Sequence, residues 1–164
     1  MADEVRRSHP TVTDAAGAPL DAACDVDRAR ALWRRDLPPA AGPVEAVAFG
    51  RGDLGAVRRL VRQRATPALG PARAADLTLA VNELTANSLD HGGGRGVLRT
   101  WSEPGALLFE VADSGRLDDV LVGRTPPVPG QPRGRGVWMV NQLCDLVQIR
   151  STAAGTVVRV HSWV

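Results

Sequence analysis

Hydrophobic and polar positions from residue 44 onward predict a series of short strands and helices. Residues 44–49 form a strand candidate, and a helix follows over 53–65 with Asp53 as its N-cap. A longer helix is predicted from Pro71 to about Asp90, because proline suits a first helical turn and three glycines follow. Arginines on the outer face of the first helix favour a solvated surface, with a partner-binding patch as the alternative.

The second half of the chain predicts two hairpins around one more helix. Alternating residues at 97–101 and 106–112 indicate the first hairpin, and those at 146–150 and 156–161 indicate the second. A helix is predicted over 136–143, between the two hairpins. This order favours an α+β fold: a two-layer α/β sandwich whose mostly antiparallel, mixed sheet is covered on one face by about three helices.

Two segments depart from this regular pattern. Residues 1–43 are rich in proline and predict a flexible arm or the remnant of a preceding domain, with 26–37 as a candidate docking helix. Residues 116–133 form a long loop rich in proline and glycine, of a length that is usually functional or disordered. We therefore expect the folded domain at 44–164.

The composition excludes several chemistries. All 20 basic Lys/Arg residues are arginine and tyrosine is absent, so a Schiff-base lysine, a tyrosine acid and a lysine-bearing phosphate loop are excluded. A net charge of +2 does not suggest direct nucleic-acid binding. No apolar run approaches the ~20 residues that span a membrane, and the polar N-terminus lacks a signal-peptide core. The two cysteines, Cys24 and Cys144, form no disulfide framework, so we expect a cytoplasmic protein.

Glu83 and Asn87 are the first candidate site residues. They are one turn apart in the longer predicted helix and therefore project from the same face. An amide oxygen can ligate Mg²⁺, and a carboxylate can orient or deprotonate a nucleophile beside phosphates. Taken alone, pairs with this spacing are more often surface or capping residues.

Asp113 and Gly115 follow directly after a predicted strand. A carboxylate in this place can accept a hydrogen bond from an exocyclic amine, and a neighbouring glycine lets a flat ring approach closely. A simple turn is the alternative interpretation, because Asp, Ser and Gly all favour turns.

Gly134 and Gly136 stand where the long loop meets the helix at 136–143. Backbone N–H groups at a helix N-terminus attract anions, and the helix dipole adds to that attraction. With Arg133 or Arg135 beside them, these groups could hold a triphosphate without lysine.

The order of these three motifs resembles the N, G1 and G2 boxes of the GHKL ATPases, which share the histidine-kinase-like ATPase fold. The N box at 83–92 reads E-L-x-x-N-x-x-x-H-G, the form that resembles the anti-sigma factor serine/threonine kinases. The resemblance covers about 49–160. It implies an ATP- and Mg²⁺-dependent kinase that phosphorylates a STAS-type anti-anti-sigma factor, sequesters a sigma factor, or does both, and so regulates transcription. Kinases of this kind commonly form homodimers.

The resemblance also implies a role for each matching residue. Glu83 would be the general base and Asn87 the Mg²⁺ ligand. Asp113 would bind the adenine amine and Gly115 would let the ring approach. Thr156 matches a threonine that contacts adenine, often through water.

At the phosphate end, the resemblance makes Gly134 and Gly136 the phosphate-binding turn and 116–133 the nucleotide lid. His91 is interpreted as a helix-end residue in preference to a phosphate contact. Any side-chain charge at the phosphates must come from arginine, and the candidates are Arg116, Arg124, Arg133 and Arg135.

Two departures from the family pattern leave other functions open. Leu117 replaces the second glycine of the G1 box, and Trp138 replaces a later glycine of the G2 box. Adenine binding should survive both changes, because Asp113 and Gly115 remain. The alternatives are a nucleotide-binding module that switches partners without useful phosphoryl transfer, and a domain that binds no nucleotide. A histidine autokinase is disfavoured, because no dimerising hairpin with a phosphoacceptor histidine precedes the domain.

Overall fold

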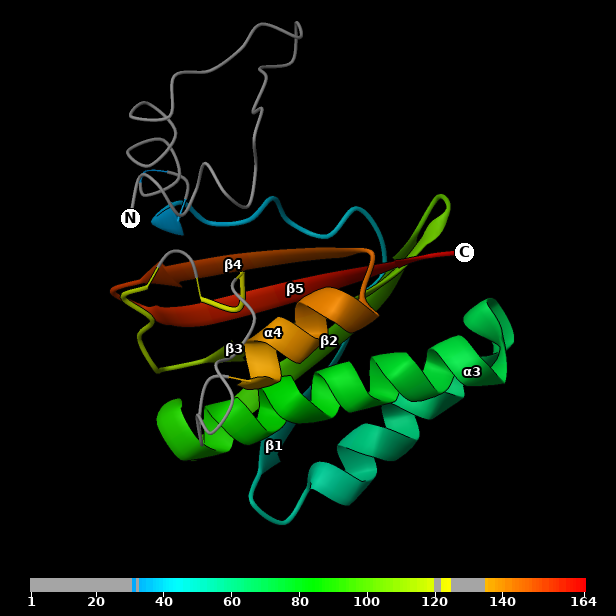
Figure 1. Cartoon of the computed structure of the whole chain (residues 1–164), viewed down its shortest axis with the longest axis horizontal. Helices are drawn as coiled ribbons and strands as arrows, with labels where there is room; N and C mark the ends of the chain where they lie inside the picture. The colour runs from blue at the N-terminus through cyan, green and yellow to red at the C-terminus, as the bar shows by residue number, and fades with distance from the viewer. Residues whose placement is uncertain (1–30, 32, 120–121, 125–134) are drawn as a thin grey trace, which may run out of the picture.

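Five strands and two helices make up the part of the chain that the structure describes. The computed structural model describes residues 31, 33–119, 122–124 and 135–164 (Figure 1). The elements in chain order are β1 (Glu45–Gly50), α3 (Leu54–His91), β2 (Arg95–Glu103), β3 (Ala106–Asp113), α4 (Arg135–Leu143), β4 (Leu146–Thr152) and β5 (Gly155–Trp163). The predicted strands, hairpins and helices are therefore present. The candidate helix at 26–37 and the predicted lid lie largely or partly outside the described residues, and the domain division at residue 44 stays a prediction.

The strands form one sheet in the order β1-β2-β3-β5-β4, and every pairing among them is antiparallel. The expectation of a mixed sheet is corrected accordingly. The reason lies in α3, which folds back on itself at Gly70, so that its two arms lie side by side (Figure 1). The chain thus returns to the end of β1 that it left, and β2 begins there with Arg95 opposite Gly50. A parallel neighbour would require a crossover to the other end of the sheet.

Gly70 is required at the fold of α3 by its backbone conformation. Its φ of 78° and ψ of 167° lie in a region that essentially only glycine adopts. Pro71 follows and begins the second arm, as predicted, while the first arm continues past the predicted end at residue 65 up to the kink. Together with α4, the two arms give the three helical segments that the sequence predicts on one face of the sheet.

The main core lies between the helices and one face of the sheet. It contains fully buried side chains from both arms of α3, from the central strands and from α4, among them Val61, Leu77, Phe109, Val140 and Val160. No helix within the described residues is long and apolar enough to cross a membrane.

The opposite face of the sheet carries a buried ion pair. Arg159 donates to Oε2 of Glu110 through Nε (3.0 Å) and Nη2 (2.7 Å), and both side chains are less than one-tenth exposed. The guanidinium also lies 4.8 Å from the ring centre of Trp101 and donates to the carbonyl of Pro38. Ala40 packs on Trp101 and its neighbours, so the segment before β1 covers part of this face.

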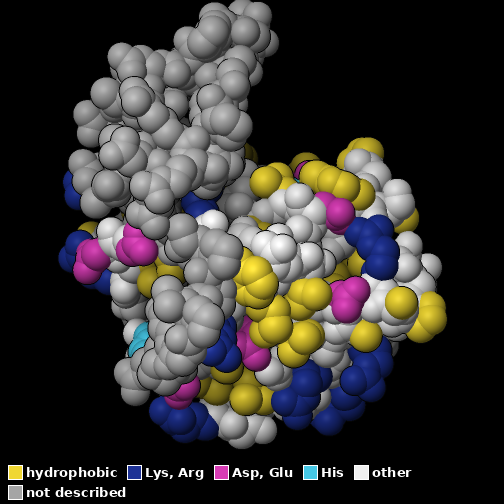
Figure 2. Space-filling view, in the orientation of Figure 1, with side chains coloured by type: hydrophobic (Ala, Val, Ile, Leu, Met, Phe, Trp, Pro, Cys, Tyr) yellow, Lys and Arg dark blue, Asp and Glu magenta, His cyan; other side chains and the backbone are white. Residues whose placement is uncertain are grey.

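Exposed arginines gather over the first arm of α3, as Figure 2 shows. Two of them have partners: Arg58 donates to Asn82 at 3.0 Å, and Arg64 pairs with Glu45 at 2.6 Å. Arg59 and Arg62 are exposed on the same arm. This arrangement agrees with the solvated surface that the sequence favours.

Gly155 at the start of β5 is expected to tolerate no side chain. Its φ is 136°, and an added Cβ would collide with the carbonyl oxygen of Asp113. We expect Gly155→Ala to lower the free energy of unfolding by about 2–4 kcal/mol, measured from denaturant unfolding. Gly105→Ala is the matched control, since its φ of 76° is also positive but no atom lies within 4 Å of the added Cβ. Its expected loss is only ~1 kcal/mol, and equal losses would contradict the steric explanation.

Candidate functional site

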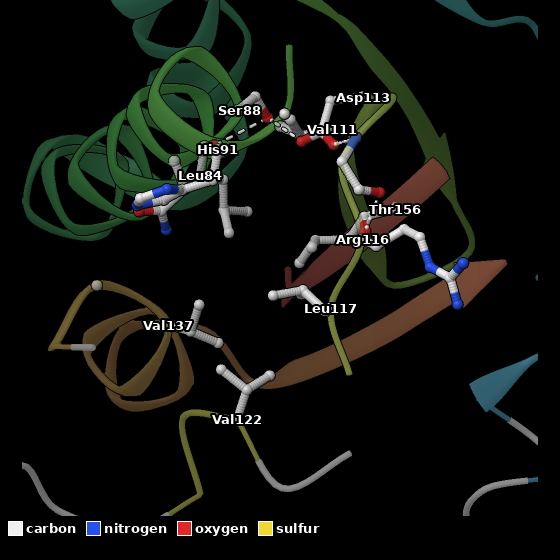
Figure 3. A pocket seen from close by; sticks show the side chains of 15 residues that line it. Leu84, Ser88, His91, Val111, Asp113, Arg116, Leu117, Val122, Val137 and Thr156 are labelled. Atoms are coloured by element: carbon white, nitrogen blue, oxygen red, sulfur yellow. Dashed lines mark hydrogen bonds between the residues drawn. The ribbon is translucent and has the colours of Figure 1, made fainter. Parts of the chain in front are cut away.

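A cavity of about 370 Å³ lies between the second arm of α3, the ends of β3 and β5, and α4 (Figure 3). Its apolar walls are formed by Leu84, Val111, Leu117, Val122, Val137 and Val158. Its polar side chains are Asn87, Ser88, His91, Asp113, Arg116 and Thr156. A mostly apolar cleft with a few convergent polar groups is the usual form of a small-molecule site.

The carboxylate of Asp113 is held in a fixed orientation at one end of the cavity. Its Oδ2 accepts a hydrogen bond from Ser88 Oγ at 2.5 Å, and its Oδ1 accepts one from the Gly115 backbone N–H at 2.8 Å (Figure 3). Ser88 comes from α3 and Asp113 from the end of β3, so the helix and the strand together position this carboxylate. The sequence places Ser88 on the inward stripe of the helix, and a serine among apolar residues is the signal that could have identified it.

Thr156 continues the polar network from β5. Its Oγ1 donates to the carbonyl of Gly115 at 2.9 Å and lies 3.2 Å from Ser151 Oγ. The backbone N–H of Leu117 donates to the same Ser151 oxygen at 2.9 Å. Ser151 was not a candidate from the sequence, because nothing in its neighbourhood on β4 distinguishes it. The structure therefore brings together the predicted residues Asp113, Gly115 and Thr156.

Glycines allow the helix end and the strand end to meet at this place. A Cβ added to Gly92 would lie 2.6 Å from Oδ2 of Asp113, and one added to Gly115 would lie 2.7 Å from the carbonyl oxygen of His91. Gly115 is therefore required for packing of the chain itself, whether or not a ring approaches it.

Glu83 and Asn87 converge on the N-terminus of α4. A Cβ added to Gly136, the second residue of that helix, would lie 3.1 Å from Oε2 of Glu83 and 3.2 Å from the amide of Asn87. Both side chains are half-buried, and neither has a hydrogen-bond partner among the described residues. Their polar groups are therefore available beside the free N–H groups that begin α4.

The structure describes only some of the arginines that the sequence predicts near the phosphates. Arg135 begins α4 and is exposed, and Arg116 lines the cavity with a side chain that is 71% exposed. Arg124 is exposed on the turn after Val122. The predicted site residues Arg133 and Gly134 lie outside the described residues.

The donor set suits Mg²⁺ bound together with phosphates. Within the described residues, no group of three or more His, Cys, Asp or Glu side chains could hold a metal by itself. Mg²⁺ commonly takes one or two protein oxygens and completes its shell with water and phosphate oxygens. The amide of Asn87 is available for such a role.

Cys144 does not provide a nucleophile. Burial, with a smaller contribution from the negative charge of Asp145, raises the pKa of its thiol to about 12. The thiol therefore stays protonated near neutral pH, and only the thiolate is strongly nucleophilic.

The two departures from the glycine boxes are accommodated without backbone strain. No non-glycine residue in the described part of the chain has a positive φ, so Leu117 needs no glycine-like conformation. Its side chain lines the cavity and packs against the core, and Trp138 is half-buried within α4.

Comparison with known proteins identifies the family. Residues 51–162 match the family model described as a histidine kinase-like ATPase domain, and the chain belongs to this family. The crystal structure of the RsbU and RsbW domains of Rv1364c from Mycobacterium tuberculosis is similar, with a TM-score of 0.55 and 18% identity. The similarity covers 74% of this chain and 32% of that one, and at this identity it shows the fold alone. The predicted histidine-kinase-like ATPase fold is thereby confirmed. No curated protein matches the sequence.

Proposed function

We propose that this chain binds ATP with Mg²⁺ and transfers the γ-phosphate to a serine or threonine of a partner protein. The observation that carries the proposal is the convergence of Glu83 and Asn87 on Gly136, since Asn87 and Gly136 line the same cavity as the oriented carboxylate of Asp113. The cavity thus offers the carboxylate of Asp113 as a hydrogen-bond acceptor for the adenine ring. Where the cavity meets the N-terminus of α4, it offers the amide of Asn87 and backbone N–H groups for phosphate chemistry, with the carboxylate of Glu83 close to Gly136.

The residues around the cavity have separate roles in binding the nucleotide. Asp113 accepts a hydrogen bond from the adenine amine, Thr156 supports the loop at Gly115, and the apolar walls exclude water from the base. Asn87 and the first turn of α4, together with Gly134 and Arg133, which precede it in the sequence, hold Mg²⁺ and the phosphates. When bound, Mg²⁺ neutralises phosphate charge.

Glu83 acts on the protein substrate. Its carboxylate accepts the proton of the attacking hydroxyl, whose oxygen forms a bond to the γ-phosphorus as the bond to the β-phosphate oxygen breaks. The products are a phosphorylated side chain and ADP. Positioning and charge stabilisation supply most of the rate in such reactions.

The partner class follows from the N-box resemblance. We propose a STAS-type anti-anti-sigma factor as substrate and a sigma factor as the alternative binding partner, in a cytoplasmic protein that regulates transcription. The RsbW domain in the structural neighbour is consistent with this class.

Phosphate transfer to purified STAS-domain proteins from the same cell tests the proposal. With ATP and Mg²⁺, we expect stoichiometric phosphoserine or phosphothreonine on one of them, mapped by mass spectrometry. Affinity capture from the native cell, with and without ATP, identifies which partner to purify.

A second candidate is a nucleotide-dependent binding module without useful transfer, which the changes at Leu117 and Trp138 favour. It predicts that ATP or ADP changes partner affinity while the partner stays unmodified. A phosphorylated partner would eliminate this candidate.

A further inference from the structure

A tryptophan from the segment before β1 contacts the wall of the cavity. The indole N–H of Trp33 donates to the backbone carbonyl of Leu117 at 3.2 Å, across 84 positions of the chain. Trp33 is half-buried and packs against the main core. Leu117 itself lines the cavity, so this contact joins the segment directly to the candidate ATP site.

Leu117 is held through both of its backbone polar groups. Trp33 binds its carbonyl, and Ser151 Oγ accepts its N–H at 2.9 Å. Ser151 lies 3.2 Å from Thr156, which donates to Gly115. The Gly115 N–H in turn reaches Asp113. An unbroken series of polar contacts thus runs from Trp33 to the carboxylate that orients the base.

The segment that carries Trp33 is anchored on the sheet. We call residues 33–40 the strap; its residues 36–40 lie over the face of the sheet opposite α3, next to Trp101 and Arg159, whereas Trp33 reaches the main core (Figure 1). The carbonyl of Pro38 accepts a hydrogen bond from the buried Arg159 at 2.9 Å, and Ala40 packs on the small apolar cluster around Trp101. Since these contacts fix the strap within a few residues of Trp33, the indole is held at Leu117 without a large entropic penalty.

We propose that Trp33 is a positioning residue of the nucleotide site and that the strap is coupled to occupancy of the cavity. The inference rests on the proposed function, because it concerns how the same site is held ready for ATP. Trp33 acts through Leu117: by fixing that carbonyl it keeps the apolar wall and the Gly115 loop in place for the base. Coupling of this kind is reciprocal, so bound nucleotide also strengthens the contact of Trp33.

Substitution of Trp33 in the full chain tests the inference. Trp33→Phe keeps an aromatic ring but removes the N–H, and we expect it to weaken ATP and ADP binding about three- to tenfold in calorimetric titration with Mg²⁺. Trp163→Phe is the matched control. Trp163 is 46% exposed at the end of β5, where it pairs with Ala106 at the opposite end of β3 from Asp113. Its substitution should leave the affinity unchanged.

Two readouts separate positioning from a general loss of stability. In the wild-type chain, ADP should change tryptophan emission and slow hydrogen exchange at the backbone around Leu117. Trp33→Phe should lose most of both responses, while Trp163→Phe keeps them. Ser151→Ala removes the other restraint on Leu117 without touching Trp33, and it should weaken nucleotide binding to a similar degree.

The outcomes distinguish the inference from the proposed function. If the wild-type chain and a folded Trp33→Phe variant bind ADP equally well, the positioning role of Trp33 is wrong and the proposed function stands. If the wild-type chain binds no nucleotide, both are wrong. If Trp33→Phe fails to fold, hydrogen exchange of the wild-type chain decides: protection by ADP at the backbone of Leu117 and of the strap supports the coupling, and the absence of that protection overturns it.

Discussion

Glu83→Gln is expected to slow phosphate transfer at least about 100-fold while ATP affinity stays within about threefold of the wild type. A glutamine has the same size beside Gly136 but cannot accept the proton of the attacking hydroxyl. Glu83 does not line the cavity in which we place the adenine ring, so ATP binding should depend on Glu83 only weakly. Single-turnover transfer to the unphosphorylated partner measures the rate, and calorimetric titration with ATP and Mg²⁺ measures the affinity.

Glu45→Gln is the matched control for this experiment. Glu45 lies at the start of β1, opposite Thr100, and pairs with Arg64 on the surface. The Glu45→Gln variant should transfer phosphate at the wild-type rate. Unchanged phosphate transfer in Glu83→Gln would contradict the assignment of Glu83 as the general base. A loss confined to ATP affinity would make Glu83 a binding residue instead.

Asp113→Ala is expected to weaken ATP binding about 10- to 100-fold. A hydrogen bond to a charged group contributes ~1.5–3 kcal/mol, and each ~1.4 kcal/mol is a tenfold change in affinity. The substitution also leaves Ser88 and the Gly115 N–H without the carboxylate that they now contact. Calorimetric titration with ATP measures the effect, and thermal unfolding verifies that the variant is folded.

Asp118→Ala tests whether the effect is specific to this carboxylate. Asp118 lies in the same loop, its side chain is 92% exposed, and it does not line the cavity. Its removal changes the net charge by the same amount and should leave the affinity unchanged. A folded Asp113→Ala protein that binds ATP normally would contradict the adenine site.

The helices and strands were predictable where a repeating pattern of apolar residues lies within one short segment of the sequence. Alternation indicates the hairpin strands, and proline and glycine mark the beginning and end of the second arm of α3. The antiparallel direction of β2 was not predictable, because it depends on how far Gly70 turns the helix back. Glu110 and Arg159 illustrate the same limit: their places on alternating strands suggest exposure, yet the strap and Trp101 bury them.

The candidate site was predictable at its motif residues and not at the residues that support them. Glu83, Asn87, Asp113 and Gly136 stand in recognisable local patterns. Ser151 and Trp33 join the site only through contacts between distant segments, and no local pattern says which residues they contact. The strap shows this most clearly, because the candidate docking helix at 26–37 includes Trp33 but nothing in the sequence indicates that Trp33 contacts Leu117.

The pairing of β3 with β5 has a consequence for when the site exists. Asp113 and Thr156 stand opposite each other in that pairing, which joins the hairpin of β2 and β3 to the hairpin of β4 and β5. Each hairpin can form from neighbouring sequence, whereas the seam between them needs residues some 40 positions apart, as in the contact of Thr156 with Gly115. In a chain with two separate hairpins, Asp113 and Thr156, the residues of the proposed adenine site, lie on different hairpins. On the proposed function, nucleotide binds only after β3 and β5 have paired, and it stabilises the finished sheet over every less complete arrangement of the same strands.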